Sequence, residues 1–118
     1  MMNSISHLIR ATGYAWHGFK IAIREELPFQ LEMSATVILI PLAIWIGHSG
    51  LSRALLILSW LIVPIIELIN SAIEAAIDRI GSEHHVLSKK AKDLAAAAVG
   101  LALLNAILVW IFIVWSRA

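Results

Sequence analysis

The 118-residue sequence has no cysteine, and only 14% of its residues are charged, whereas 60% are apolar. The lack of cysteine excludes disulfides and thiolate metal sites. Nine basic and eight acidic residues leave a net charge of +1, so no basic surplus favours a nucleic-acid partner. Soluble domains are roughly half apolar. The higher fraction here, with a mean hydropathy of +0.86, indicates a membrane protein.

The length is that of one domain, which we take as residues 1–118. Three spanning helices of about 20 residues each would use half of the chain and leave little room for a separate soluble module. The first ten residues lack a basic stretch followed by an unbroken apolar core and a small-residue cleavage site. We therefore expect no secretory signal peptide.

Residues 4–26 are predicted to form an amphipathic helix on the membrane surface. Within about 100° of a helical wheel lie Ile5, Leu8, Ile9, Thr12, Trp16, Phe19 and Ile23. The basic residues Arg10, Lys20 and Arg24 fall outside that arc. A helix of this kind lies in the headgroup plane with its apolar side towards the lipid. Pro28 then marks a position where the next helix can start, because a first turn does not need its N–H.

Three membrane-spanning helices are predicted over residues 29–47, 51–80 and 93–116. Pro41 predicts a local bend in the first, and residues 48–50 form a short turn. The second would be about 45 Å long, which exceeds a hydrocarbon core of about 30 Å. Its polar end, from Glu67 onward, should therefore emerge from the lipid. Residues 81–93 read as a charged link.

Basic residues near the span ends predict the orientation. Seven lie on one side, namely Arg10, Lys20, Arg24, Arg79, Lys89, Lys90 and Lys92, and two, Arg53 and Arg117, on the other. The positive-inside rule then places the N-terminus in the cytoplasm and the C-terminus in the periplasm. Trp45, Trp110 and Trp115, which lie near span ends, are interpreted as interfacial anchors.

The polar end of the second span carries the most informative residues. One arc of about 100° on a helical wheel holds Glu67, Asn70, Ser71, Glu74 and Asp78. Placing a carboxylate at membrane depth costs free energy, so such a residue usually faces a partner, a cavity or a functional pathway. Their repulsion favours a shared cation or proton, and oxygen ligands favour Mg²⁺. The alternative is a network of salt bridges with neighbouring Arg and Lys residues.

This acidic arc straddles the boundary between lipid and water, so it can meet a lipid hydroxyl on one side and a water-soluble reagent on the other. Glu26 could turn towards the arc or fray into water. Lys92 and Asp93 begin the third span at the same interface, where an ammonium could neutralise phosphate oxygens. Within the third span, small residues such as Ala95, Ala98, Ala102 and Ala106 predict close helix packing, and Asn105 predicts an interhelical hydrogen bond.

The segment from Glu67 to Glu83, together with Ala91-Lys92-Asp93, closely resembles the bacterial integral-membrane diacylglycerol kinase family. Supporting matches include Gly13, Tyr14, Trp16, Gly18, Glu26 and Phe29. The resemblance implies transfer of the ATP γ-phosphate to the hydroxyl of diacylglycerol, giving phosphatidate. It further implies a homotrimer in the bacterial inner membrane, with active sites between protomers.

The same resemblance implies roles for individual residues. It makes Glu67 the general base and Glu26 and Glu74 the Mg²⁺ ligands. It assigns ATP contacts to His7, Tyr14, Glu26, Glu74, Glu83, His85, Lys92 and Asp93. It assigns the lipid substrate to Trp16, Lys20, Phe29, Gln30 and Glu67, with Asn70 and Asp78 supporting the acidic cluster. His7, Ala15 and His84 depart from the family pattern, whereas the acidic arc matches it.

Three other functions stay open at this point. The related undecaprenol kinases share much of the acidic motif, and sequence separates the two acceptors poorly. A non-enzymatic membrane subunit could use the acidic arc to dock a basic partner helix. A proton or metal transporter would need polar groups across the membrane, and residues 54–66 offer only Ser59.

Overall fold

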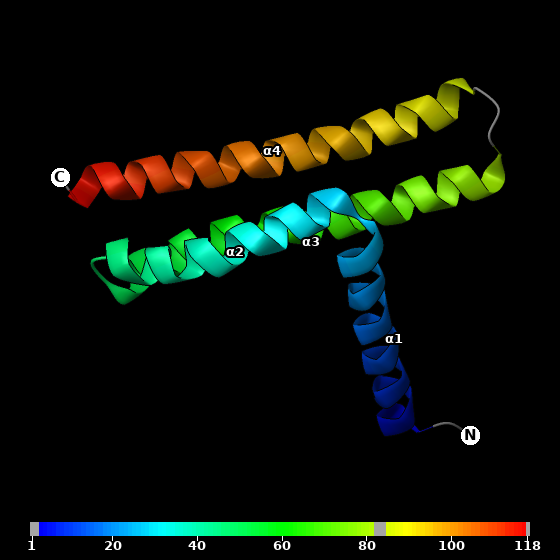
Figure 1. Ribbon diagram of the computed structural model, residues 1–118, viewed down its shortest axis with the longest axis horizontal. Helices are drawn as coiled ribbons and strands as arrows, with labels where there is room; N and C mark the ends of the chain where they lie inside the picture. The colour runs from blue at the N-terminus through cyan, green and yellow to red at the C-terminus, as the bar shows by residue number, and fades with distance from the viewer. Residues whose placement is uncertain (1–2, 82–84, 118) are drawn as a thin grey trace.

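The computed structural model describes residues 3–81 and 85–117, and in these ranges every regular element is a helix. The helices are α1 (Ser4–Glu25), α2 (Leu27–Ile46), α3 (Gly50–Ile80) and α4 (Val86–Arg117) (Figure 1). Three stretches are long and apolar enough to cross a membrane, namely Leu27–Ile46, Gly50–Ile80 and Val86–Ser116. The prediction of an all-α chain with three such helices is confirmed.

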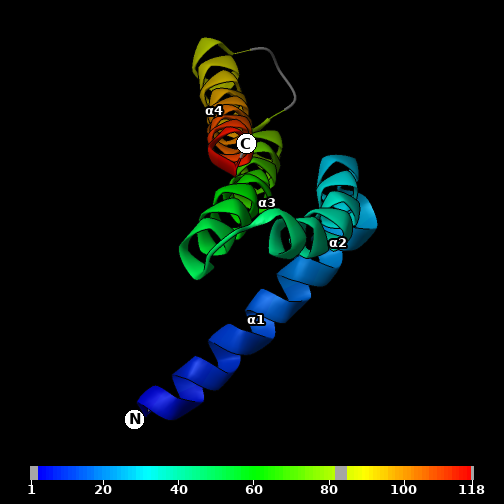
Figure 2. The same cartoon turned by 90° about the vertical axis from the view of Figure 1, so that its left-hand side faces the viewer.

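The helix α3 is the centre of the bundle. The helix α4 runs antiparallel along one side of α3 and α2 packs on another side, whereas α1 contacts mainly α2 (Figures 1 and 2). From its junction with α2, α1 points away from the other three helices (Figure 1). The chain therefore has a polar end, where α3 ends and α4 begins, and a separate N-terminal arm.

The corner between α1 and α2 is held by caps and aromatic packing. Glu26 ends α1 and precedes α2, and Pro28 lies in the first turn of α2, as predicted. Phe29 is only 1% exposed and meets Phe19 edge to face, with ring centroids 5.6 Å apart. The Gln30 side-chain amide donates a 2.9 Å hydrogen bond to a backbone carbonyl of α1. These contacts set where α1 leaves the bundle.

The turn between α2 and α3 is closed by polar side chains at both helix ends. Ser49 caps α3 in a reciprocal capping box with Ser52. Arg53 Nε donates a 2.9 Å hydrogen bond to the carbonyl oxygen of Ile44, which satisfies a group at the end of α2. Both α2 and α3 continue through an internal proline, Pro41 and Pro64 respectively. The bend expected at Pro41 stays a prediction.

The contact between α3 and α4 uses small residues. Val63 is fully buried and packs with Ala102 and Ala106 of α4. Ala95 is buried as well, whereas Ala98 is exposed, so the predicted small-residue packing holds for only part of the set. Because lipid supplies no hydrophobic force between helices, such close approach lets dispersion contacts hold them together.

Two tryptophans also join neighbouring helices. Trp110 Nε1 donates a 3.0 Å hydrogen bond to the Leu56 carbonyl oxygen, and Trp60 Nε1 donates a 2.8 Å hydrogen bond to Thr36 Oγ1. Trp110 is therefore more than the interfacial anchor predicted from its place near a span end. Trp115, in contrast, is 73% exposed, as an anchor would be.

The start of α4 differs from the prediction. Residues 81–93 were expected to form a charged link, but α4 begins at Val86, seven residues before the predicted start of the span. Lys89 and Asp93, four residues apart, form a 2.6 Å ion pair that supports the helix. The His85 Nδ1 atom accepts a 3.0 Å hydrogen bond from the Leu87 N–H at the first turn.

Candidate functional site

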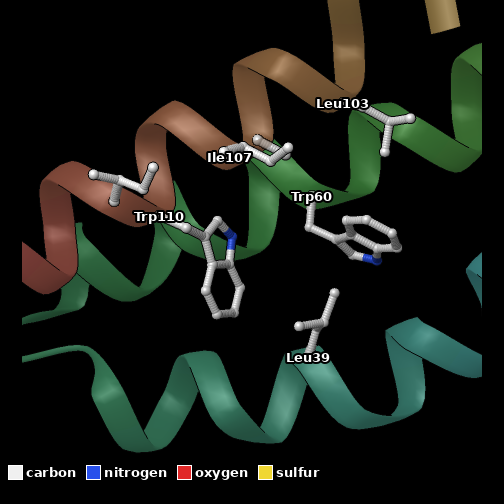
Figure 3. A pocket seen from close by; sticks show the side chains of 7 residues that line it. Leu39, Trp60, Leu103, Ile107 and Trp110 are labelled. Carbon is white, nitrogen blue, oxygen red and sulfur yellow. The ribbon is translucent and has the colours of Figure 1, made fainter. Parts of the chain in front are cut away.

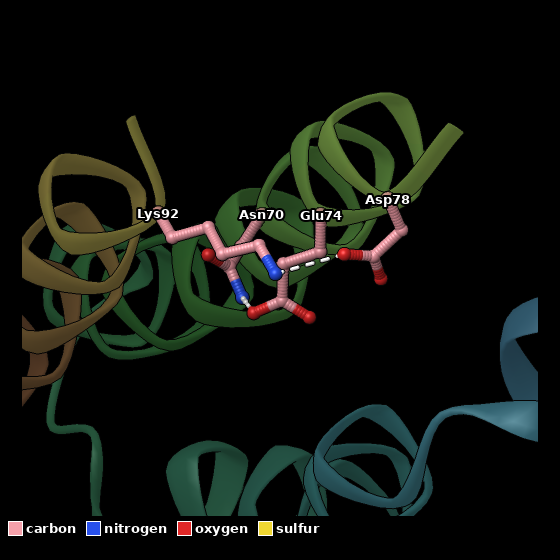
Figure 4. Close-up of polar contacts among 4 residues, drawn as sticks. All are labelled: Asn70, Glu74, Asp78 and Lys92. Atoms are coloured by element: carbon pink, nitrogen blue, oxygen red, sulfur yellow. Dashed lines mark hydrogen bonds and ion pairs between the residues drawn. The ribbon is translucent and has the colours of Figure 1, made fainter. Parts of the chain in front are cut away.

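The acidic arc of α3 becomes more exposed along the helix. Glu67 and Asn70 are buried, with exposed fractions of 5% and 8%, Glu74 is half-buried, and Asp78 is exposed. Asn70 Nδ2 donates a 3.2 Å hydrogen bond to Glu74 Oε1 (Figure 4). The arc therefore joins a buried carboxylate to groups that open onto the polar end of α3.

Lys92 connects this arc to α4. Its Nζ atom lies 2.8 Å from Asp78 Oδ1 (Figure 4), and the side chains of Lys92 and Asp78 are 42% and 68% exposed. Exposed ion pairs add little to stability, so Lys92 can exchange Asp78 for another anion at small cost. Among the described residues, no Lys or Arg forms a salt bridge with Glu67 or Glu74. A salt-bridge network thus accounts for only the exposed end of the arc.

Three other carboxylates, from the α1–α2 corner, α2 and α3, lie near enough to Glu67 to interact with it electrostatically. Glu26, Glu32 and Glu74 each interact electrostatically with Glu67. Glu26 comes from the corner between α1 and α2 and is half-buried, so it does not simply fray into water. The structure therefore brings together the three glutamates predicted for the site and adds a fourth.

That fourth carboxylate, Glu32 on α2, was missed from sequence. Its Oε1 atom is buried and has no hydrogen-bond partner among the described residues. Glu32 lies near the start of the apolar span predicted over residues 29–47. The sequence offered only a general indication of its importance. Placing a carboxylate inside an apolar spanning helix costs free energy, so such a residue usually has a function.

Asn70 Oδ1 is a second buried oxygen that lacks a donor in the described part of the chain. Buried polar atoms normally have a partner, so the two oxygens favour a ligand that brings hydroxyl or cationic groups. In residues 3–81 and 85–117, no three His, Asp or Glu side chains lie close enough to enclose a metal ion. Mg²⁺ usually takes one or two carboxylates together with substrate phosphates. The oxygen donors present fit that arrangement.

The α1 residues implied by the resemblance do not join this cluster within one chain. His7, Tyr14, Trp16 and Lys20 are all exposed on α1, and α1 points away from the polar ends of α3 and α4 (Figure 1). Glu83 lies outside the described residues. A single chain therefore presents two separate groups of predicted substrate contacts.

A separate, apolar hollow lies away from the carboxylates. It has a volume of about 280 Å³ and is lined by Leu39, Trp60, Leu103, Ala106, Ile107, Trp110 and Ile111 (Figure 3). Its lining contains no charged residue, and Trp60 precedes Glu67 by about 10 Å of helix. This hollow suits hydrocarbon and cannot itself perform acid–base chemistry.

Comparison with known proteins decides the family. Residues 13–114 match the model of the prokaryotic diacylglycerol kinase family. The chain belongs to this family. The diacylglycerol kinase of Escherichia coli (strain K12) is 42% identical over 112 residues, covering 95% of this chain and 92% of the relative. That of Haemophilus influenzae is 42% identical over 106 residues, covering 90% of each chain. That of Helicobacter pylori is 40% identical over 103 residues, covering 87% of this chain and 80% of the relative.

The family assignment makes this chain a membrane lipid kinase. It confirms the resemblance to diacylglycerol kinases that the acidic arc indicated. The alternatives of a non-enzymatic subunit and of a transporter are therefore set aside. The acceptor lipid, the metal and the role of each residue are the subject of the proposal that follows.

Proposed function

We propose that the chain transfers the γ-phosphate of ATP to the hydroxyl of diacylglycerol, giving phosphatidate at the cytoplasmic surface of the bacterial inner membrane. The observation that carries this proposal is the position of Glu67. Its carboxylate is buried where the apolar part of α3 gives way to the polar end, among Glu26, Glu32 and Glu74. The relatives named diacylglycerol kinase support the choice of acceptor.

Glu67 acts as the general base in this proposal. Phosphoryl transfer requires mainly that two oxygens be positioned and that developing charge be neutralised. As the lipid hydroxyl oxygen forms its bond to the γ-phosphorus, the bond to the oxygen bridging to ADP breaks, and the hydroxyl proton moves to the Glu67 carboxylate. A positioned base typically contributes about 10²- to 10⁴-fold in rate.

Glu26 and Glu74 would hold Mg²⁺ together with the ATP phosphates. When bound, the ion neutralises charge on the phosphate oxygens. Asn70 orients Glu74 through the hydrogen bond between their side chains. Lys92 would leave Asp78 and bind a phosphate oxygen, for which its exposed ion pair leaves it available.

The remaining predicted contacts divide between the nucleotide and the lipid. For the nucleotide we propose His7, Tyr14, Glu83, His85 and Asp93. For the lipid we propose Trp16, Lys20, Phe29 and Gln30, with Asp78 in a supporting role. Since Phe29 is buried and Gln30 bonds to α1, these two would act by holding the corner that borders the lipid.

A homotrimer with sites between protomers would complete this arrangement. In one chain, His7 and Tyr14 lie on the arm that points away from the acidic arc (Figure 1). A neighbouring protomer could bring its own α1 to that arc and so unite both groups. We place α1 in the headgroup plane because its Trp16 and Phe19 rings stack and are exposed. The N-terminus would face the cytoplasm and the C-terminus the periplasm.

A lipid kinase assay tests the proposal. Purified protein in lipid bilayers would receive ATP labelled at the γ-phosphate and either diacylglycerol or undecaprenol, each with and without Mg²⁺. We expect labelled phosphatidate in the presence of Mg²⁺ only. Labelling of undecaprenol alone would identify undecaprenol, in place of diacylglycerol, as the acceptor lipid. Labelling of neither lipid would refute the proposed reaction.

A further inference from the structure

The apolar hollow between α2, α3 and α4 has the size of a segment of hydrocarbon chain. Its volume is about 280 Å³, and its lining includes Leu39 of α2, Trp60 of α3 and Leu103 of α4 (Figure 3). A cavity of about 150 Å³ is large enough to bind benzene. By that measure the hollow accommodates on the order of ten carbon atoms.

Both indole N–H groups at the hollow are already bonded within the protein. Trp60 Nε1 donates to Thr36 Oγ1 at 2.8 Å, and Trp110 Nε1 donates to the Leu56 carbonyl oxygen at 3.0 Å. In Figure 3 the two indoles stand on opposite sides of the hollow, and Leu39 faces it from α2. The hollow therefore presents aromatic rings and aliphatic side chains, which bind hydrocarbon through dispersion contacts.

The hollow lies on the same side of α3 as Glu67, two turns further into the apolar half. Trp60 precedes Glu67 by seven residues, which rotates it by only about 20° around the helix and displaces it by about 10 Å. On α2, Leu39 follows Glu32 by the same seven residues, and Glu32 interacts electrostatically with Glu67. Both helices therefore carry a carboxylate and, two turns deeper on the same side, a residue that lines the hollow.

The depth of the hollow matches the outer part of an acyl chain. Trp110 bonds to Leu56, which precedes Glu67 by about 16 Å of helix. The hollow thus extends from about 10 Å to about 16 Å below Glu67. One leaflet contributes about half of a 30 Å hydrocarbon core. The ends of acyl chains therefore lie at this depth when their headgroups are at the level of Glu67.

We propose that the hollow binds the terminal half of one acyl chain of the diacylglycerol whose hydroxyl lies at Glu67. The inference rests on the proposed function, which places that hydroxyl, and it adds the part of the protein that recognises the chain. Lipid supplies no hydrophobic driving force, so recognition depends on dispersion contacts with rings that hydrogen bonds hold in place. Such contacts favour an acceptor whose chain is long enough to reach Trp60 and Trp110.

Photolabelling of the parent protein tests where the chain end lies. Vesicles containing the protein would receive diacylglycerol with a diazirine at the end of one acyl chain, or phosphatidylcholine carrying the same chain, without ATP. Mass spectrometry then locates the label. We expect label around Leu39 and Leu103, about tenfold more from diacylglycerol than from phosphatidylcholine, because only diacylglycerol has a hydroxyl to donate to Glu67. Equal labelling by both lipids would show that the hollow takes any lipid chain and would overturn the proposal.

Filling the hollow tests whether it acts on the substrate. Leu103→Trp enlarges a lining residue, whereas Leu104→Trp makes the same change at the next position, outside the lining. The parent residues are 38% and 49% exposed. We expect Leu103→Trp to raise the KM for dipalmitoylglycerol by about tenfold, the lower end of what one methylene is worth in an apolar pocket. The KM for dihexanoylglycerol, whose chains end short of Trp60, should stay unchanged, as should both KM values in Leu104→Trp. An equal change for both acceptors in Leu103→Trp, or no change, would contradict the proposed site.

The two experiments separate this inference from the proposed kinase reaction. Photolabelling needs no ATP, so it reports the position of the chain whether or not the lipid is phosphorylated. Selective labelling without phosphorylation would refute the reaction and support the chain site. Phosphorylation of diacylglycerol without selective labelling would support the reaction and refute the chain site.

Discussion

The two halves of α3 differ in what they bury. Over residues 50–66 the buried side chains include Leu56 and Val63, which are fully enclosed by neighbouring helices. Over residues 67–80 the buried side chains are Glu67 and Asn70. One helix thus combines a structural half with a polar half, and Glu67 marks the boundary between them.

The comparison teaches where stability and chemistry reside in a small membrane enzyme. The apolar half is held by close contacts with small residues and by indole hydrogen bonds from Trp60 and Trp110. The polar half buries carboxylates, which costs free energy unless a ligand or a proton compensates. Substitutions in the polar half should therefore reduce kinase activity without loss of stability. Substitutions in the apolar half should reduce stability while kinase activity is retained.

The largest expected effect is that of Glu67→Gln. Loss of the proposed base should lower the rate of lipid phosphorylation by at least about 10²-fold, while the thermal unfolding temperature stays the same or rises, because one buried charge is gone. Initial rates at saturating ATP and thermal unfolding in detergent measure the two effects. Glu25→Gln, which neutralises an exposed glutamate at the end of α1, is the matched control. Near-normal activity of Glu67→Gln would remove Glu67 from the role of base.

Glu74→Ala should alter the metal dependence. Loss of one proposed ligand is expected to raise the Mg²⁺ concentration for half-maximal rate by about tenfold, equivalent to about 1.4 kcal/mol of binding free energy. Titration of activity with Mg²⁺ at fixed ATP measures this shift. A titration curve that coincides with that of the parent protein would exclude Glu74 as a ligand.

Glu32→Gln should have a smaller effect on rate than Glu67→Gln. It removes one of the carboxylates that interact with Glu67, and with it part of the negative potential that draws the hydroxyl proton, but it keeps the shape of the side chain. We expect a loss of about tenfold, which corresponds to about 1.4 kcal/mol in the barrier. A rate equal to that of the parent protein would show that Glu32 has no part in the reaction.

Trp110→Phe should have the smallest effect on activity but a measurable effect on stability. The substitution keeps an aromatic ring and removes the indole N–H that bonds to the Leu56 carbonyl. One such hydrogen bond is worth about 1 kcal/mol, so the unfolding temperature should fall while the kinase rate is retained. Trp115→Phe, at an exposed position, should change neither. If Trp110→Phe lost activity but kept its stability, the division between the two halves of α3 would be wrong.

Much of the fold could be predicted because hydropathy and helix signals are local. The apolar runs located three helices, Pro28 marked the start of α2, and residues 48–50 marked the turn before α3. The start of α4 was placed too late, because its first turns carry charges that read as a link. The ion pair between Lys89 and Asp93 shows that these charges support the helix instead.

The candidate site could be predicted only in part. The acidic arc follows from helical spacing, so Glu67, Glu74 and Asp78 were found. Glu32 was not, because the feature that distinguishes it is a buried oxygen without a donor, and burial depends on neighbouring helices. In the same way, Trp110 looked like an interfacial anchor until α3 supplied a carbonyl acceptor.

By itself, the sequence determined that this chain is a membrane protein of three apolar helices with an acidic arc on the second, because hydropathy and helical periodicity depend only on the order of residues. The tertiary structure decided which carboxylates converge on Glu67, which cation reaches Asp78, and which side of α4 is left uncovered around Asn105. The physical reason is that these features are distances and exposures between separate helices, and such quantities exist only once the helices have packed.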